Sequence, residues 1–267
     1  MTLKTLFSLR DKRKKTAIDY IIGDDTLVHL YRTYKNIRKH GEPEKRLNHY
    51  LSIIETDIPR TYRSSETYAL ETKELLHMFC LYSPVGYIQG HNFLAAACVH
   101  FFRGRTPYLS FYLFNALFDN IKDIYLLQID NTFANLDTYT FAPCVESCLV
   151  LFLDFYKTKH PKQKISEMVE LALKNFVQWR LFGTLTLSCH LHVDTSTHII
   201  RYFLPCLYDR EEFQSKLSAL ALSFLFCCFL DKALTEESIL AVQSGSLTED
   251  GLLAMLDSAE NTIKLFK

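Results

Sequence analysis

Apolar residues recur at helical spacing along most of this chain. One set of five residues shares a single face of a helix with about 3.6 residues per turn: Leu47, Tyr50, Leu51, Ile54 and Ile58. Residues 165–176 repeat this spacing, with polar residues between the apolar ones. No stretch alternates apolar and polar residues between hairpin turns, as a half-buried strand would. The pattern therefore predicts an all-α protein.

Short stretches that interrupt the helical pattern separate the predicted helices. We expect interruptions at residues 58–64, 83–90, 103–107, 157–164, 205–212 and 243–248. Thr235 and Thr248 each precede two acidic residues, and Ser65 precedes Glu66. A hydroxyl followed by acidic residues is typical of a helix N-terminus, because it accepts from free backbone amides while the acids complement the helix dipole. We therefore expect helices to begin at these positions.

The longest apolar run extends from Leu217 to Leu230 and ends at two charged residues. A membrane-spanning helix needs roughly 20 apolar residues, so this shorter run predicts a buried core helix. We therefore expect no transmembrane segment. The apolar stretch at residues 3–9 is also too short for the apolar part of a secretory signal.

Composition agrees with a helical fold and excludes some function classes. The 267 residues include 30 Lys and Arg against 30 Asp and Glu, so the net charge is near zero. This balance argues against a nucleic-acid-binding protein, whose surface carries an excess of positive charge. Gly and Pro contribute only 8 and 7 residues, which favours long helices over many tight turns. With no repeat or low-complexity linker visible, we expect one domain covering residues 1–267.

The cysteines suggest core packing more than chemistry. All 8 lie in or beside apolar runs, and no pair has C-x-x-C spacing. This distribution indicates reduced, buried cysteines of a cytosolic protein rather than a disulfide framework. Cys144 and Cys148 could share a helix face, but two ligands do not make a zinc site. The cysteine and three histidines of residues 189–198 lack a matching second half, so we expect no metal site.

A first unusual segment, residues 54–61, reads I-E-T-D-I-P-R-T. Pro59 lacks an amide hydrogen and disfavours helical backbone at the preceding residue. We therefore expect the helix that begins near Leu47 to end by Asp57, with Arg60 on a rigid loop. A carboxylate at a helix C-terminus faces the negative end of the dipole, so Asp57 should have a specific partner, either Arg60 or a backbone amide. Asp57→Asn should keep or raise thermal stability, because it removes a carboxylate from the C-terminus of a helix. The alternative is that Asp57 only starts a turn and Arg60 is a surface cation.

A second unusual segment, residues 84–92, reads P-V-G-Y-I-Q-G-H-N and precedes a helix predicted at residues 93–102. Gly86 and Gly90 lie close together in a chain with only 8 glycines, which indicates a backbone bend or a close backbone approach. Gln89 carries both a donor and an acceptor at its tip, so it could accept from a water and donate to a phosphate oxygen. The alternative is that Gln89 caps a neighbouring backbone group.

Most sequence motifs of known enzymes are absent. The chain contains no G-x-x-x-x-G-K-[ST], so we do not expect it to bind a nucleoside triphosphate through a P-loop of its own. Motifs of dinucleotide-binding proteins, zinc proteases and serine hydrolases are also missing. Candidate chemistry is therefore confined to the two unusual segments.

Taken together, these segments resemble the signature of the TBC domain family, the GTPase-activating proteins for Rab-type small GTPases. The spellings I-x-x-D-x-x-R-T and Y-x-Q-G occur in the family's order, with Arg60 and Gln89 separated by 29 positions. The matching positions are Ile54, Asp57, Arg60, Thr61, Gly86, Tyr87, Gln89 and Gly90.

The resemblance implies an all-α, TBC-like multi-helix fold and a mechanism in which two side chains enter the nucleotide site of a GTP-bound Rab-type GTPase. Arg60 would be an arginine finger that neutralises charge on the phosphates, and Gln89 a glutamine finger that helps to place the attacking water. Asp57 would orient the site, and the other matching residues would shape it: Thr61, Gly86, Tyr87 and Gly90. GTP and Mg²⁺ would belong to the partner. The chain would thus be a GTPase activator without a cofactor of its own, and not itself an enzyme.

The resemblance is weaker outside the two segments. Ile18 stands where a Trp is usual in the opening segment 13–23, and Ser188 replaces a Phe in the later segment that begins at Trp179. Residues 198–201 read H-I-I-R where the family has R-I-W-D. These differences indicate a divergent member. They leave open a second hypothesis, a TBC-like module that binds a GTPase or an adaptor without accelerating hydrolysis, and a third, an unrelated helical scaffold.

The resemblance also implies a cytoplasmic protein that acts in vesicle trafficking. The basic run at residues 10–15 could contact an anionic membrane surface and so recruit the protein peripherally to endomembranes. A solvated helix face is the alternative for this run.

Overall fold

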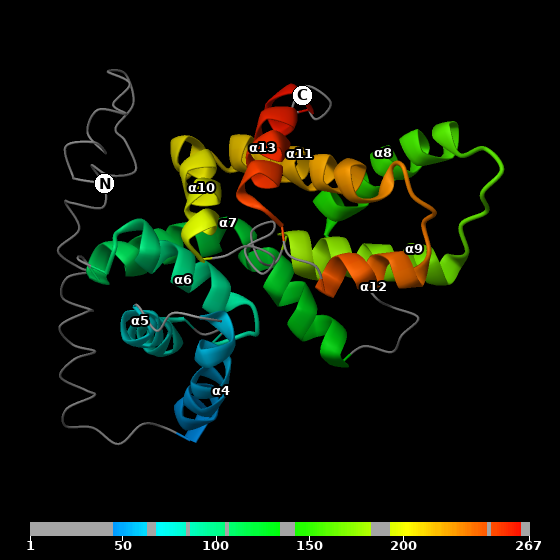
Figure 1. The fold of residues 1–267 in the computed structure, drawn as a ribbon. Coiled ribbons are helices and arrows are strands. Elements are labelled where there is room, and N and C mark those ends of the chain that lie inside the picture. Colours follow the sequence, from blue (N-terminus) through cyan, green and yellow to red (C-terminus); the bar gives the residue numbers. More distant parts are fainter. Residues whose placement is uncertain are drawn as a thin grey trace, which may run out of the picture. The chain divides into compact units, whose positions relative to one another are not determined.

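The all-α class predicted from the sequence is confirmed. The computed structural model describes residues 45–62, 68–83, 86–104, 107–133, 142–182, 193–244 and 247–262. These residues form ten α-helices, α4 to α13, together with one π-helical and one 3-10 segment, and they contain no strand (Figure 1).

The chain divides into two compact units, Met1–Asp119 and Asn120–Lys267, and the boundary falls within the long helix α7 (Pro107–Phe133). Both unusual sequence segments belong to the first unit. The single domain expected from the sequence stays a prediction.

The first unit contains α4 (Lys45–Thr61), α5 (Ala69–Tyr82), α6 (His91–Phe101) and the first part of α7. Helix α4 contacts α5 and α6, and α5 contacts α6. Nine of the 11 residues of α6 are buried, so this helix is held on several sides. The second unusual segment ends in the first turn of this helix, so a well-packed element holds its last residues, His91 and Asn92.

Helix α4 extends further than the sequence predicted. We expected it to end by Asp57, but it includes Pro59 and ends at Thr61. Ile54, Ile58 and Tyr62 are all buried at four-residue spacing, so the buried face of the helix continues past the proline. The backbone amide of Tyr62 also donates to the carbonyl of Ile58 at 3.3 Å. Packing and this bond outweigh the loss of one amide donor at position 59.

The second unit contains the remaining helices. In chain order these are α8 (Pro143–Lys159), α9 (Glu167–Phe176), the π-helical segment Val177–Phe182, α10 (Val193–Phe203), the 3-10 segment Leu204–Cys206, α11 (Arg210–Phe229), α12 (Glu236–Ser244) and α13 (Glu249–Thr262). Helix α11 contacts α8, α13 and the π-helical segment, so it is central to this unit.

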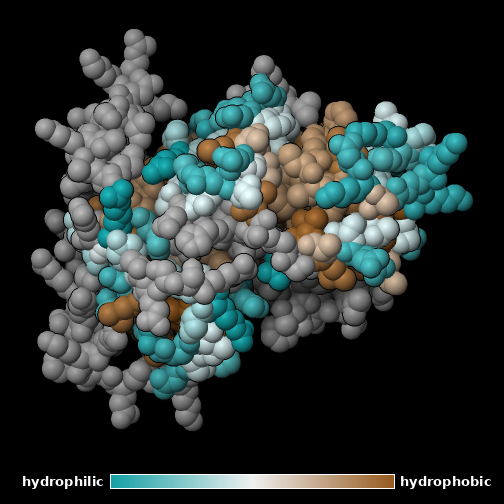
Figure 2. All heavy atoms as spheres, viewed as in Figure 1, coloured by the Kyte–Doolittle hydropathy of each residue, from teal (hydrophilic) through white to brown (hydrophobic). Residues whose placement is uncertain are grey.

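The burial of α11 confirms the predicted core helix as far as Leu225, whereas Cys227, which we expected to be buried, is exposed. Every residue from Leu217 to Leu225 is buried, which no helix could achieve with only one face against the protein. By length and composition α11 is the one described helix that could cross a membrane, yet 61% of its most apolar window is buried inside the unit. On the face drawn in Figure 2, apolar residues gather over α11.

Helix starts follow the predicted caps where the structure describes them. Thr235 Oγ1 accepts from the Ser238 amide at 3.1 Å just before α12, and Thr248 Oγ1 accepts from the Gly251 amide at 3.2 Å at the start of α13. The predicted cap at Ser65 lies outside the described residues. The remaining interruptions fall within a few residues of their predicted places.

Candidate functional site

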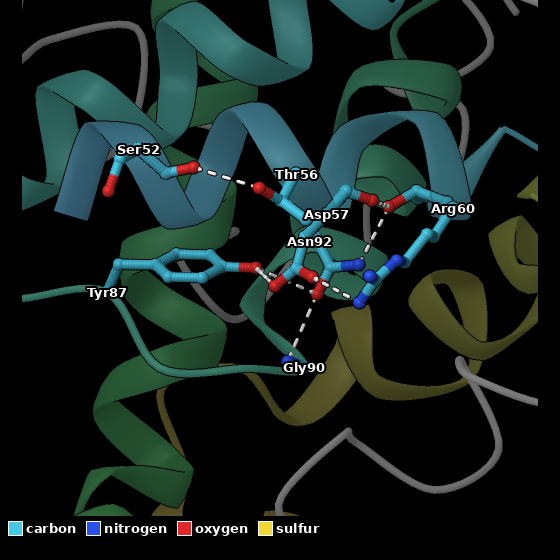
Figure 3. Close-up of polar contacts among 8 residues, drawn as sticks. Ser52, Thr56, Asp57, Arg60, Tyr87, Gly90 and Asn92 are labelled. Atoms are coloured by element: carbon cyan, nitrogen blue, oxygen red, sulfur yellow. Dashed lines mark hydrogen bonds and ion pairs between the residues drawn. The ribbon is translucent and has the colours of Figure 1, made fainter. Parts of the chain in front are cut away.

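The two unusual sequence segments lie next to each other in the first unit (Figure 3). The last turns of α4 carry Asp57, Arg60 and Thr61, and residues 86–90 lead into α6. Side-chain hydrogen bonds join the two segments. The structure thus brings four of the predicted residues into one buried network: Asp57, Thr61, Tyr87 and Gly90.

Asp57 is a buried carboxylate with two partners. Its side chain accepts a hydrogen bond at Oδ2 from the Tyr87 hydroxyl at 2.7 Å, and Oδ1 lies 3.6 Å from Arg60 Nη1. Asp57 is only 5% exposed, and a charge at such a position is costly unless it is paired and hydrogen-bonded. The predicted partner Arg60 is confirmed. Tyr87, rather than a backbone amide, supplies the second contact.

Asn92 connects the two segments, and it is absent from our sequence-based set of site residues. Its Oδ1 accepts from the Gly90 amide at 3.0 Å, and its Nδ2 donates to Thr61 Oγ1 at 2.7 Å. Thr61 Oγ1 in turn donates to the Asp57 carbonyl at 2.9 Å. The only local sequence signal was a short amide side chain in the first turn of a helix, where Asn commonly binds backbone groups.

Both glycines of the second segment adopt backbone conformations that favour glycine. Gly86 has φ 73° and Gly90 has φ 107°, which are positive values that other residues rarely adopt. A Cβ on Gly86 would also lie 2.3 Å from Cζ of Tyr50 on α4. The structure confirms a bend at both glycines and a close approach at Gly86. They allow the backbone to pass against α4 and then enter α6.

The two proposed finger residues, by contrast, are exposed. The side chain of Arg60 is 68% exposed although its neighbour Thr61 is buried. Gln89 is also exposed between two buried positions, Tyr87 and Gly90. Among the residues that the structure describes, none forms a hydrogen bond with the Gln89 side chain, so it does not act as a backbone cap there.

His91, the first residue of α6, is fully buried beside the segment. Its ring contacts the rings of Phe79, Tyr87, Phe114 and Phe118, and its Nδ1 accepts from the Ile88 amide at 3.3 Å. Burial lowers the pKa of His91 to about 3 because the charged form is poorly solvated there. His91 therefore stays neutral and packs as part of the support of the segment.

The part of the chain that the structure describes contains no candidate metal site. No group of three or more His, Cys, Asp or Glu is placed there to hold an ion. Burial raises the pKa of Cys144 to about 11 and that of Cys148 further, which keeps both thiols protonated as in a core. The candidate cluster at residues 189–198 lies outside the described residues except for its last part. The expected absence of a metal site stays a prediction.

The divergent segment 198–201 lies in α10 of the second unit. His198 Nε2 and Glu249 Oε1 are 2.8 Å apart, and Arg201 Nη1 lies 3.5 Å from His198 Nδ1. Arg201 thus lies beside a histidine of its own helix. Ile18, Ser188 and the side chain of Trp179 lie outside the described residues.

This arrangement suits recognition of an anionic group better than covalent chemistry. The carboxylate of Asp57 is occupied by Tyr87 and Arg60, so it is not available as a general base. The groups that face solvent are a guanidinium, which pairs with phosphate oxygens, and an amide, which binds both donors and acceptors. Each of these groups is followed in the chain by a residue of the buried network, Thr61 after Arg60 and Gly90 after Gln89.

A family model matches most of the chain. Residues 20–242 match the Rab-GTPase-TBC domain. This range includes the network at α4 and α6 and extends through most of the second unit. No curated protein matches the chain.

Proposed function

Because this chain belongs to the Rab-GTPase-TBC domain family, we propose that it activates GTP hydrolysis by a Rab-type small GTPase. Arg60 and Gln89 would enter the nucleotide site of the GTP-bound partner and act there in trans. GTP and Mg²⁺ would be bound by the partner, since the chain has no P-loop. In this role the chain would switch off a GTPase of vesicle trafficking, on the cytoplasmic side of endomembranes.

The observation that carries the proposal is the contrast between exposed and buried residues at the network. Arg60 and Gln89 are exposed, while the residue that follows each of them, Thr61 and Gly90, is buried and hydrogen-bonded to Asn92. Such a frame limits how far each finger can move before a partner arrives. Pre-positioned groups stabilise developing charge at little reorganisation cost.

Arg60 would supply most of the rate enhancement. Phosphoryl transfer depends mainly on positioning and on neutralising charge, and an arginine supplied in trans raises the rate by about 10³–10⁵-fold, or about 4–7 kcal/mol. The guanidinium end of this pair is 68% exposed and lies 3.6 Å from Asp57, so solvent weakens the contact, and Asp57 keeps its hydrogen bond from Tyr87 when Arg60 turns to a phosphate. The pair would orient the guanidinium without holding it back.

Gln89 would act on the water or on the partner's switch loop. Its amide can accept from a water while it donates to an oxygen of the partner or of the phosphate. Because none of the described residues occupies this amide, it needs no rearrangement of its own bonds before it binds. Asp57 and Tyr87 would not touch the nucleotide, and their role would be to orient Arg60 and to support the turn.

The experiment that tests this function measures GTP hydrolysis by a panel of purified Rab-type GTPases, each with and without the parent protein. We expect strong acceleration for at least one member. Arg60→Ala should abolish it. Arg103→Ala is the matched control, because it removes another exposed arginine of the same unit at the opposite end of α6.

Two outcomes would contradict the proposal. Equal loss in both arginine variants would mean that net charge, rather than a finger at position 60, drives the effect. Complex formation with a GTP-bound partner but no acceleration would instead support the alternative of a non-catalytic binding module.

A further inference from the structure

We propose that Asn92 is a positioning residue that couples the two finger residues. It forms hydrogen bonds with Thr61, which follows Arg60, and with Gly90, which follows Gln89. This inference rests on the proposed function. Asn92 would touch neither the nucleotide nor the partner. Its part would be to fix the last turn of α4 relative to the turn at residues 86–90, so that Arg60 and Gln89 are presented together.

The orientation of the Asn92 amide follows from its partners. The Gly90 backbone amide can only donate, so it must face the oxygen Oδ1, at 3.0 Å. The nitrogen Nδ2 then points to Thr61 Oγ1, at 2.7 Å. The Tyr87 hydroxyl, which donates to Asp57, also lies 3.1 Å from Oδ1. One side-chain amide therefore forms hydrogen bonds with both segments (Figure 3).

The bond to Thr61 matters because the end of α4 is weakened. Pro59 has no amide hydrogen, so the carbonyl of Glu55 loses its usual helical donor in the last turns. Thr61 Oγ1 donates to the Asp57 carbonyl at 2.9 Å and so closes the turn that carries Arg60. Asn92 donates to the same hydroxyl and ties this turn to α6.

The bond to Gly90 fixes the other segment in the same way. Gly90 has φ 107°, a conformation that glycine reaches without strain but does not prefer strongly over others. A hydrogen bond from its amide to Asn92 selects this conformation and thereby sets the direction in which Gln89 leaves the backbone. Asn92 is 2% exposed, so water cannot easily replace either bond.

The test uses Asn92→Ala and Thr61→Val, which break the coupling from its two sides. Each should lower kcat for the stimulated reaction by about 10- to 100-fold, as expected for a small misplacement of catalytic groups. Binding to the partner loaded with a non-hydrolysable GTP analogue should change by no more than about threefold, since the frame acts on positioning. Thr61→Ser keeps the hydroxyl and should retain most of the activity.

Asn120→Ala is the matched control for loss of a buried amide. Asn120 is buried in the second unit and donates to the Leu207 carbonyl at 3.0 Å. This variant should lower stability and leave kcat unchanged. Should Asn92→Ala fail to fold, Thr61→Val and Thr61→Ser decide the question. Parental kcat in either Asn92→Ala or Thr61→Val, or a loss that lies wholly in binding, overturns the proposal.

A second measurement does not depend on any GTPase. Hydrogen–deuterium exchange of the isolated protein should become faster in Asn92→Ala both at residues 57–62 and at residues 86–92. Faster exchange in only one of these segments overturns the coupling. If the parent protein stimulates no GTPase but both segments respond, the coupling stands and the proposed function fails.

Discussion

The network at the end of α4 and the centre of α11 bury opposite kinds of side chain. From Leu217 to Leu225, α11 is buried on all sides, mostly with apolar residues. At α4 and α6 the buried residues include Asp57, Thr61 and Asn92, each with hydrogen-bonded partners, and the exposed ones are Arg60 and Gln89. The difference separates stability from function. Burial of apolar area in α11 stabilises the fold, while the hydrogen bonds of the polar network hold the two segments that carry the exposed groups.

This comparison predicts that the largest effect on folding comes from α11. Leu222 is fully buried, and Leu222→Asp both removes about 1.5–3 kcal/mol of apolar burial and buries an unpaired carboxylate. We expect this variant to unfold or aggregate. Circular dichroism and analytical ultracentrifugation would measure the outcome.

Leu240→Asp on α12 is the control, because Leu240 is 61% exposed. It should fold and melt close to the parent. A soluble Leu222→Asp variant with a cooperative melt near that of the parent would show that α11 is not the core helix we describe.

The next largest effect should be on catalysis without loss of stability. Arg60→Lys keeps the positive charge but lacks the planar fork that binds two phosphate oxygens. We expect it to lose most of the approximately 10³–10⁵-fold contribution of the arginine. Because Arg60 is 68% exposed, its melting temperature should match that of the parent. Full activity in single-turnover hydrolysis by the Lys variant would remove the finger assignment.

Asp57→Asn should lower both the stability of the fold and the stimulated activity. From the sequence we expected stability to hold or rise, because Asp57 was predicted to lie at the end of a helix. The structure changes this expectation, since Asp57 is buried and accepts from Tyr87 at 2.7 Å. Loss of a charge-assisted hydrogen bond should lower stability by about 1–3 kcal/mol and, through misplacement of Arg60, lower activity by up to about 100-fold.

Tyr87→Phe separates the two effects of Asp57→Asn. It removes the same hydrogen bond but leaves the contact between Asp57 and Arg60. We expect a similar fall in melting temperature with a smaller fall in activity. Equal activity in Asp57→Asn and the parent would leave Asp57 with a structural role only.

The smallest effect at neutral pH is a dependence of stability on pH through His91, which grows only in acid. Its pKa is lowered to about 3, whereas an unfolded histidine titrates near 6.5. Below pH 6.5 the unfolded chain binds a proton that the folded chain does not, so stability falls as pH falls. The slope is about 1.4 kcal/mol per pH unit, or about 2 kcal/mol between pH 6.5 and pH 5.

His91→Gln tests this dependence, since Gln is neutral throughout and can still accept from the Ile88 amide. Denaturant unfolding at pH 5 and at pH 6.5 would measure the difference in stability. We expect a smaller difference in the Gln variant than in the parent. The same difference in both proteins would mean that other groups cause the loss of stability in acid.

Local sequence rules predicted the parts of the fold that depend on local physics. The start of α12 after Thr235 and the buried run from Leu217 follow from capping and from apolar periodicity. The rules failed at Pro59, where the local cost of a proline competes with the buried face of α4, which only tertiary packing reveals.

Residues of the candidate site could be predicted only where the residue type itself indicates a particular backbone conformation. Gly86 and Gly90 stood out because positive φ requires residues of this kind. Asn92 could not be found in this way, because its partner Thr61 lies 31 positions earlier and nothing local marks the pairing. The bond from Tyr87 to Asp57, across 30 positions, was hidden for the same reason.

The most direct test of the central claim is complex formation with a GDP-bound partner GTPase in the presence of aluminium fluoride, which mimics the transferring phosphoryl group. If Arg60 and Gln89 stabilise the transition state in trans, the parent should form a complex that requires fluoride, and Arg60→Ala and Gln89→Ala should each weaken it strongly. Binding that is equally tight with and without fluoride, and equal in all three proteins, would contradict a catalytic role for these residues.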